Sequence, residues 1–355
     1  MKWVLWFSAA LFAITPLSLA ALGPVSAQQS SRDTGSHPER QITIDVDVTD
    51  NKGNPVPGLQ PQDFTLLDDK QPLTIVSFHA YSPKLEPEDA PRVIIAVDEV
   101  NLGFYGVGEA RQTLNKFLRE DGGRLPFSTS LLLISDTYQG KTPASRDGNV
   151  LADALSANQQ GLRIIGRSQG VYGAIDRYGI GFKALESLAE DQAAKPGRKL
   201  LIWLSPGWPL LSGPGMLLTR KDEDALFDAV VRVNTDLRKA RITLYSVDPA
   251  GMNDAGGLRT YYYETFLNGV RSSNYVQNGN LGLQVLAVQS GGLVLNSNND
   301  IGASIAKCAA DAKAFYTLTF EAPRADRVNE YHSLHVKIDR RGLKARTRTG
   351  YYAQP

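Results

Sequence analysis

The central part of the chain is a series of short apolar runs separated by amphipathic stretches. Each run has the length of a strand and lacks a polar face, which is typical of strands covered on both sides. Most of the stretches between them place apolar residues at helical spacing, as in Ala110, Leu114 and Leu118. Strands that alternate with helices predict an α/β fold with a doubly wound, mainly parallel sheet. The runs cover residues 93–97, 130–135, 199–204, 242–247 and 293–295.

Both ends of this region alternate apolar and polar residues with a period of two. Residues 42–48 place isoleucine or valine at every second position, which predicts a half-buried strand. We expect an N-terminal β segment at 42–82, a proline-rich linker at 83–91, an α/β body at 92–312 and a C-terminal β segment at 313–355. Each β segment is too small to bury a core alone. We therefore predict that the two segments pair into one small all-β satellite.

The first 27 residues have the pattern of a secretory signal peptide. A basic start is followed by an apolar segment from Trp3 to Ala21, and Val25 and Ala27 provide the small residues of a cleavage site. An uncleaved membrane anchor is the alternative, because the apolar segment approaches the length of a membrane span. We expect residues 28–41 to form a flexible leader and no later run to span a bilayer. The sequence thus predicts export to the periplasm, to the cell envelope or out of the cell.

Composition narrows the choice of partners. The 355 residues carry a formal net charge of +1, so nothing in the overall charge favours nucleic acid or an anionic membrane surface. Cys308 is the one cysteine, which excludes an intrachain disulfide. A single thiol in a helical pattern is most often a small buried apolar residue, and we expect that role for Cys308.

Polar residues follow the ends of the predicted strands. The carboxyl ends of parallel strands meet at one edge of a sheet, so these side chains could gather there. Such an acid cluster could serve phosphoryl or metal-assisted hydrolysis, which makes a hydrolase one hypothesis. The simpler interpretation is that strand-to-loop turns favour Asp and Ser for local hydrogen bonds. No P-loop, G-x-S-x-G motif or histidine metal spacing supports catalysis, so we predict a protein that is not an enzyme. The residues concerned are Asp98, Asp136, Ser205 and Asp248.

The stretch Gly179-x-Gly181-x-x-Ala184 has the spacing of a dinucleotide-binding fingerprint. That fingerprint requires a strand directly before it, and here a loop rich in Gly, Arg, Ser and Tyr precedes it. We therefore expect the start of a helix over 176–191 and no dinucleotide cofactor.

The order of these segments resembles the von Willebrand factor A (VWA) domain. The resemblance rests on VIIAVDEVN, SLLLISDTYQGKTPASRD, PGRKLLIWLSPGWP and ARITLYSVDPAGM, taken in chain order. The flanks VDVTDNKGNPVPGLQPQDFTLLDDKQPLTIVSF and YTLTFEAP…GLKARTRTGYYA resemble the VWFA-related branch first catalogued in acidobacteria. This resemblance covers nearly all of the chain after the leader and implies a VWA/Rossmann-like fold.

VWA domains typically hold a divalent cation at a site called MIDAS, and they use it to bind an acidic residue of a partner. The family motif is D-x-S-x-S after the first strand, a Thr in a later loop and an Asp after the fourth strand. Here only the first Asp is matched, by Asp98. Val100 and Leu102 occupy the two serine positions, Pro206 the late Asp position, and no Thr lies in 176–181.

This degenerate motif leaves two interpretations of Asp98. Asn101 and Ser205 could supply replacement oxygens, so that Mg²⁺ or Mn²⁺ binds and adhesion depends on the metal. The simpler interpretation is that Asp98 accepts backbone N–H bonds from the loop that follows, and that no cofactor is present.

Aromatic residues mark the candidate partner surface. Residues 252–280 form a long predicted loop of Gly, Asn, Ser and Tyr, and tyrosines among small polar residues suit recognition surfaces. The alternative is that these aromatics pack on the sheet as a lid. We expect this loop and the SPGW turn at the same edge of the sheet as Asp98. The predicted partner-binding residues are Trp208, Tyr261, Tyr262, Tyr263 and Tyr275.

A second, basic surface is expected near the C-terminus. Lys344, Arg346 and Arg348 alternate along a predicted strand, which would place them on one face. They could contact an anionic polymer or a lipid head group, although such a row is usually a solvated strand face. The favoured hypothesis for the whole chain is an exported, non-enzymatic VWA-like module that binds or scaffolds an unidentified protein of the cell envelope or the exterior.

Overall fold

The computed structural model describes most of the chain after the N-terminal leader. The described residues are 40–81, 90–102, 104–136, 139–158, 170–208, 218–249, 263–296 and 300–355. These described residues belong to one compact unit. No helix among these residues is long and apolar enough to cross a membrane.

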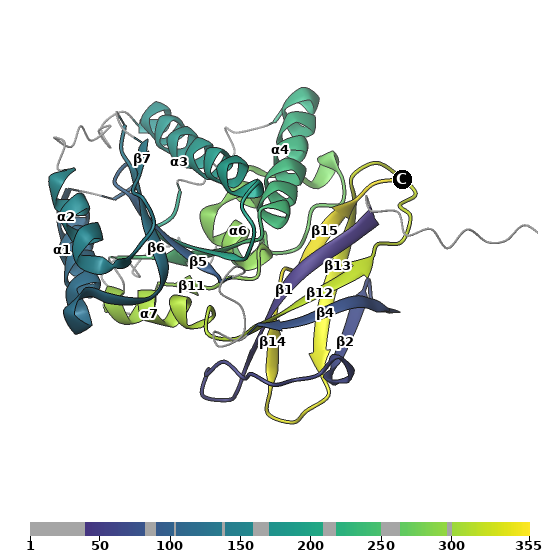
Figure 1. Cartoon of the computed structure of the whole chain (residues 1–355). Helices are drawn as coiled ribbons and strands as arrows, with labels where there is room; N and C mark the ends of the chain where they lie inside the picture. The colour runs from purple at the N-terminus through teal and green to yellow at the C-terminus, as the bar shows by residue number, and fades with distance from the viewer. Residues whose placement is uncertain are drawn as a thin grey trace, which may run out of the picture. The chain divides into compact units, whose positions relative to one another are not determined.

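A twisted sheet with strand order β11-β10-β9-β5-β6-β7 lies at the centre of the α/β body (Figure 1). The pairs from β11 to β6 are parallel, whereas β7 and β8 each pair antiparallel with β6, which they follow in the chain. The first four apolar runs of the sequence form its inner strands, and the fifth forms the half-buried edge strand β11. The bounds are β5 Arg92–Asp98, β6 Arg124–Ile134, β7 Gln139–Lys141, β8 Ser145–Asp147, β9 Lys199–Leu204, β10 Ile242–Val247 and β11 Val294–Leu295.

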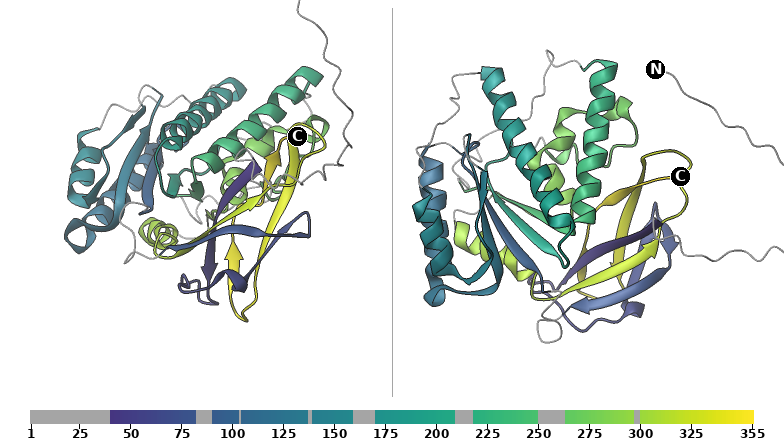
Figure 2. Two further views of the ribbon diagram at one scale, coloured as in Figure 1. Left: turned by 45° about the vertical axis from the view of Figure 1, so that its right-hand side comes forward. Right: turned by 45° about the horizontal axis from the view of Figure 1, so that its top comes forward.

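Helices cover both faces of this sheet (Figures 1 and 2). Along β5, Val93, Ile95 and Val97 pack in the core shared with α1, α2 and α7. Ile94 and Ala96 point the other way, into the core shared with α3, α4 and α6. The predicted doubly wound α/β class is therefore confirmed. The helices are α1 Phe104–Arg119, α2 Gly148–Ala157, α3 Gly170–Ala193, α4 Arg220–Lys239, α6 Leu283–Gln289 and α7 Ile301–Ala310.

The two ends of the chain build a β sandwich beside this body, as predicted from their period-two patterns (Figure 1). One sheet has the order β14-β1-β12-β4 and the other β15-β13-β2-β3, so both sheets combine N-terminal and C-terminal strands. Ile42, Ile44, Val46 and Val48 fill the space between them. The strands are β1 Gln41–Thr49, β2 Phe64–Asp68, β3 Gln71–Leu73, β4 Ile75–Tyr81, β12 Phe315–Glu321, β13 Glu330–Ile338, β14 Lys344–Arg346 and β15 Gly350–Ala353.

The predicted burial of the single cysteine is confirmed. Cys308 is a fully buried free thiol in α7, as predicted, and burial raises the pKa of its thiol.

The expected helix start near Asp176 is wrong, because α3 already begins at Gly170. Gly179 and Gly181 thus lie inside a helix, where glycine costs about 1 kcal/mol relative to alanine. At Gly181 a side chain would collide with a neighbour, because a Cβ would lie 2.7 Å from Trp208 Nε1.

Candidate functional site

Asp98 ends β5, a central strand of the parallel sheet, and its side chain is 0% exposed. One carboxylate oxygen, Oδ1, accepts hydrogen bonds from the Asn101 backbone N–H at 3.1 Å and from Asn101 Nδ2 at 3.1 Å. The other, Oδ2, accepts from Asn101 Nδ2 at 2.9 Å, Trp203 Nε1 at 3.1 Å and Trp208 Nε1 at 3.3 Å. The predicted backbone bond is present, and the side chains of Asn101, Trp203 and Trp208 donate to the same carboxylate.

Two opposing effects act on the Asp98 carboxyl. Burial raises its pKa above the ordinary value, because a charge is poorly solvated in the interior. Hydrogen bonds from Trp203 and Asn101, and from the Ser205 hydroxyl, favour the charged form and partly offset this rise. The carboxylate is thus held by N–H and O–H donors of the protein itself.

The indole of Trp208 is fixed by packing as well as by its bond to Asp98. Its ring meets Trp203 edge-on, with centroids 5.5 Å apart, and also contacts Tyr178 and Phe182 of α3. Gly181 on the same helix leaves the space that the indole fills. Trp208 is only 4% exposed, so its side chain belongs to the core and does not provide the partner-binding surface expected for it.

The residues around Asp98 do not fit a hard divalent cation. Mg²⁺ requires a nearly octahedral set of oxygen ligands, and both oxygens of Asp98 already accept N–H bonds. Val100 and Leu102, at the two serine positions of the motif, are buried apolar residues. Of the expected helpers, Asn101 turns its amide nitrogen to Asp98, and Ser205 Oγ accepts from the Gly207 backbone N–H at 3.2 Å.

The other strand-end polar residues lie at separate strands. Asp136 follows β6, and its Oδ1 is buried without a hydrogen-bond partner among the described residues. Asp248 follows β10 and is half-buried. Ser205 follows β9, and its hydroxyl donates to the Asp98 carboxylate.

The tyrosine-rich segment is partly described. Tyr261 and Tyr262 lie outside the described residues, Tyr263 is half-buried, and Tyr275 is 75% exposed. Its described part reaches the sandwich, because the Val270 carbonyl accepts from Tyr352 Oη at 3.2 Å and Gly269 packs against the Tyr331 ring. The expectation that this segment stays at the Asp98 edge is therefore wrong for residues 269–271.

This segment lines a half-open cavity of about 270 Å³. Arg271 lies in its wall and forms a long ion pair with Asp69 of the sandwich, 3.6 Å between Nη2 and Oδ1. The wall is held locally, since Asn280 Oδ1 accepts from the Gln277 backbone N–H at 2.8 Å. Its lining is Thr265, Phe266, Asn268, Gly269, Val270, Arg271, Tyr275, Gln277 and Asn280.

A group of two acids and a histidine lies in the sandwich. Asp68, Asp69 and His332 offer ligand atoms within 4.8 Å of one another. The Asp68 carboxylate already bonds His332 Nδ1 at 3.0 Å and accepts from Tyr351 Oη at 2.7 Å, and Asp69 accepts from Ser333 Oγ at 2.7 Å. These bonds hold the three side chains in place, while His332 Nε2 is buried without a hydrogen-bond partner among the described residues.

Buried ion pairs join the sandwich to the α/β body. Asp47 on β1 is 2% exposed and accepts two bonds from Arg198, at 2.6 and 2.8 Å. Arg198 directly precedes β9, is 1% exposed, and stacks on the Phe315 ring at 4.9 Å. Burial alone lowers the pKa of this guanidinium, but attraction to Asp47 raises it well above its ordinary value.

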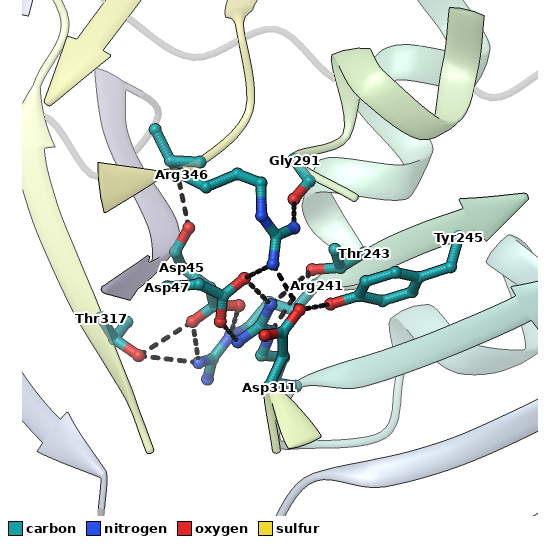
Figure 3. A network of polar contacts seen from close by, with 11 residues as sticks. Asp45, Asp47, Arg241, Thr243, Tyr245, Gly291, Asp311, Thr317 and Arg346 are labelled. Carbon is teal, nitrogen blue, oxygen red and sulfur yellow. Dashed lines mark hydrogen bonds and ion pairs between the residues drawn. The ribbon is translucent and has the colours of Figure 1, made fainter. Parts of the chain in front are cut away.

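Arg346 extends this network from β14 (Figure 3). Its guanidinium pairs with Asp47 Oδ2 at 3.1 Å and with Asp311, and it donates to the Gly291 carbonyl. The buried Tyr245 hydroxyl donates to Asp311 Oδ2 at 2.7 Å. The expectation of a solvated basic face is therefore wrong for Arg346 and for Arg348, which is 5% exposed. Both side chains face the α/β body, whose position the sequence pattern did not indicate.

Comparisons with known proteins give similarities of fold only at a low level. No protein-family model matches the chain, and no curated protein matches it. The similar solved structures include the pilus adhesin SpaC from Lactobacillus rhamnosus GG, manganese-loaded Plasmodium vivax TRAP protein and a von Willebrand factor type A from Catenulispora acidiphila.

The sequence identity to each of these structures is low. Identities are 9%, 8% and 8%, with TM-scores of 0.37, 0.34 and 0.32. The matches cover 84%, 82% and 90% of this chain and 43%, 99% and 75% of the other chains. The chain thus spans less than half the length of the adhesin. Similarities at this level establish no function for this chain, whose own residues form an α/β body with a closed carboxylate centre at Asp98.

Proposed function

We propose that this chain is a non-enzymatic binding module that holds a protein partner at the cavity beside Tyr275, without a cation at Asp98. The observation that carries the proposal is an exposed tyrosine in the wall of a 270 Å³ cavity. Arg271 adds a positive charge to the same wall. Tyrosine and arginine are the residue types that most often dominate the energy of protein interfaces.

The size and chemistry of the cavity favour a protein partner over a small metabolite. Its volume lies just below the roughly 300–1,000 Å³ of small-molecule sites. Its amide side chains, Asn268, Gln277 and Asn280, offer hydrogen bonds but no nucleophile or general base. A protruding side chain of a partner fits such a space, with Tyr275 as a rigid contact at the side.

The properties of Asp98 support the non-catalytic, metal-independent part of the proposal. A carboxylate without exposure cannot reach a substrate, and its oxygens already have donors. We therefore favour neither metal-dependent adhesion nor a hydrolase that uses the strand-end acids.

We also propose that the chain is exported and belongs to the VWFA-related branch. The signal-like pattern of residues 1–27 supports export. The resemblance of the flanking segments supports the branch. These same segments supply the strands of the sandwich.

Photo-crosslinking tests the binding surface directly. A benzophenone amino acid at position 275 should give a discrete adduct with one protein of an envelope extract from the source organism. The matched control is the same probe at Tyr172, an equally exposed tyrosine on α3, where no such adduct should form. Identical adducts at both positions, or none at 275, would contradict the proposal.

The captured protein then permits a quantitative measurement. Tyr275→Ala should weaken binding by about thirty-fold, since truncation of a dominant interface residue costs about 2 kcal/mol or more. Tyr172→Ala should leave the dissociation constant unchanged. Adding EDTA should have no effect.

A further inference from the structure

Three arginines surround a small cavity between the α/β body and the sandwich. The cavity measures about 20 Å³, which is room for one water-sized particle. Arg238 comes from the end of α4, Arg241 from the turn before β10, and Arg348 from the segment between β14 and β15. The lining is Thr43, Ile44, Asp45, Leu237, Arg238, Arg241, Ile242, Thr243, Ser290 and Arg348.

Only one of these arginines has a carboxylate partner. Arg241 Nη2 bonds Asp45 Oδ1 at 2.6 Å, and Thr317 Oγ1 donates to the same oxygen at 2.9 Å (Figure 3). That carboxylate is the only acid in the lining of the cavity. Two positive charges therefore remain in excess, on Arg238 and Arg348.

Arg348 is nearly enclosed and poorly satisfied. It is 5% exposed, and within the described part of the chain its guanidinium donates only to the Asn234 carbonyl, at 3.4 and 3.5 Å. Among the described residues it has no carboxylate within ion-pair distance. Arg238 makes no side-chain hydrogen bond or ion pair in the described part of the chain. Burial, followed by repulsion from Arg238, lowers the pKa of Arg348 to about 9, so the group still carries its charge at neutral pH.

The hydroxyl groups around the cavity do not relieve this excess. Ser290 Oγ accepts from the Leu244 backbone N–H and donates to the Ala287 carbonyl, both at 2.9 Å. Thr243 Oγ1 accepts from Arg198 Nη2 at 3.1 Å. Guanidinium N–H groups thus remain as the donors available to a particle in the cavity, and a donor-rich, positively charged space favours an anion.

We propose that this cavity binds one small inorganic anion of chloride size, held by the guanidinium groups of Arg238 and Arg348. The small volume favours an ion of chloride size over sulfate, phosphate and nucleotides. The anion lies where α4 meets the C-terminal strands, so its binding favours the docked arrangement of sandwich and α/β body. This site is independent of the partner surface at Tyr275.

Thermal unfolding of the full chain tests the proposal. Sodium chloride replaces sodium gluconate at constant ionic strength, because gluconate is too large for the cavity. Chloride should raise the Tm along a saturating curve by several degrees, since a ligand that binds only the folded state stabilises it by mass action. Bromide should substitute for chloride. Equal Tm values in chloride and gluconate overturn the proposal.

Variants separate an anion site from a general salt effect. Arg238→Gln, at a half-buried position, should abolish the chloride dependence and should be at least as stable as the wild type in gluconate, because it removes the repulsion with Arg348. Arg232→Gln, which changes an exposed arginine of the same helix, should keep the full chloride response. A chloride response that persists in Arg238→Gln, or that disappears in Arg232→Gln, overturns the proposal.

Discussion

Replacing Asp47 with alanine should lower the free energy of unfolding by about 3–5 kcal/mol, because removal of one partner leaves a buried charge without compensation. The charge left behind belongs to Arg198, whose guanidinium also bonds Thr243 Oγ1 and lies over the Phe315 ring but meets no second carboxylate within ion-pair distance among the described residues. Arg346 also loses a carboxylate, although it keeps Asp311. Urea unfolding followed by far-UV circular dichroism measures the loss.

An exposed ion pair provides the matched control for Asp47. Asp153 pairs with Arg119 Nη2 at 2.6 Å, but 72% of its side chain is exposed. Asp153→Ala should change the unfolding free energy by less than about 1 kcal/mol. Similar losses in the two variants would show that the buried pairs between sandwich and α/β body contribute no more than surface charges.

Replacing Asp98 with alanine should cost about 3 kcal/mol or more. The substitution leaves the indole N–H groups of Trp203 and Trp208 and the amide of Asn101 without an acceptor in the interior. Each buried donor without a partner costs about 1–3 kcal/mol, and relief from burying the carboxylate offsets part of the sum. Urea unfolding measures the loss, and tryptophan fluorescence reports the changed packing. An unchanged stability would contradict the role assigned to Asp98.

The near-isosteric Asp98→Asn variant adds a pH signature. Burial raises the folded-state pKa of Asp98 above its unfolded value of about 3.9. The protonated carboxyl therefore contributes to the stability of the folded state, and this contribution is fully present below the unfolded pKa. That contribution is lost as the pH rises through the folded pKa. The stability of the wild type relative to Asp98→Asn should therefore fall with rising pH across this window. A difference that stays constant from acidic to neutral pH would contradict the shift.

The apolar runs predicted the main sheet because a strand that is covered on both faces has no polar position to interrupt its apolar residues. For residues 93–97, this pattern alone was enough to predict a buried strand. The period-two residues 42–48 predicted which side of β1 is buried in the sandwich. The same pattern made Asp47 look exposed, since it says nothing about a second domain that covers the polar face. Arg348 was misplaced for the same reason.

The centre at Asp98 was predictable in part. The position of an acid after an apolar strand indicated a capping role, and the backbone bond from Asn101 has that origin. The two indole bonds depend on how Trp203 and Trp208 pack, and Trp208 reaches Asp98 only because Gly181 leaves space inside a helix. Two glycines in one stretch look like a helix boundary in the sequence. The tertiary contact that favours glycine there becomes visible only in the fold.

Tryptophan-sensitised terbium luminescence tests most directly whether Asp98 is a closed hydrogen-bonded centre or a cation site. In residues 36–355 the two tryptophans are Trp203 and Trp208, and both contact the Asp98 carboxylate. Excitation at the red edge of the tryptophan band therefore reports an oxygen-seeking cation bound there. We expect no sensitised emission that Mg²⁺ or Mn²⁺ can displace. A saturable emission that Mg²⁺ displaces and Asp98→Asn abolishes would contradict the metal-independent account.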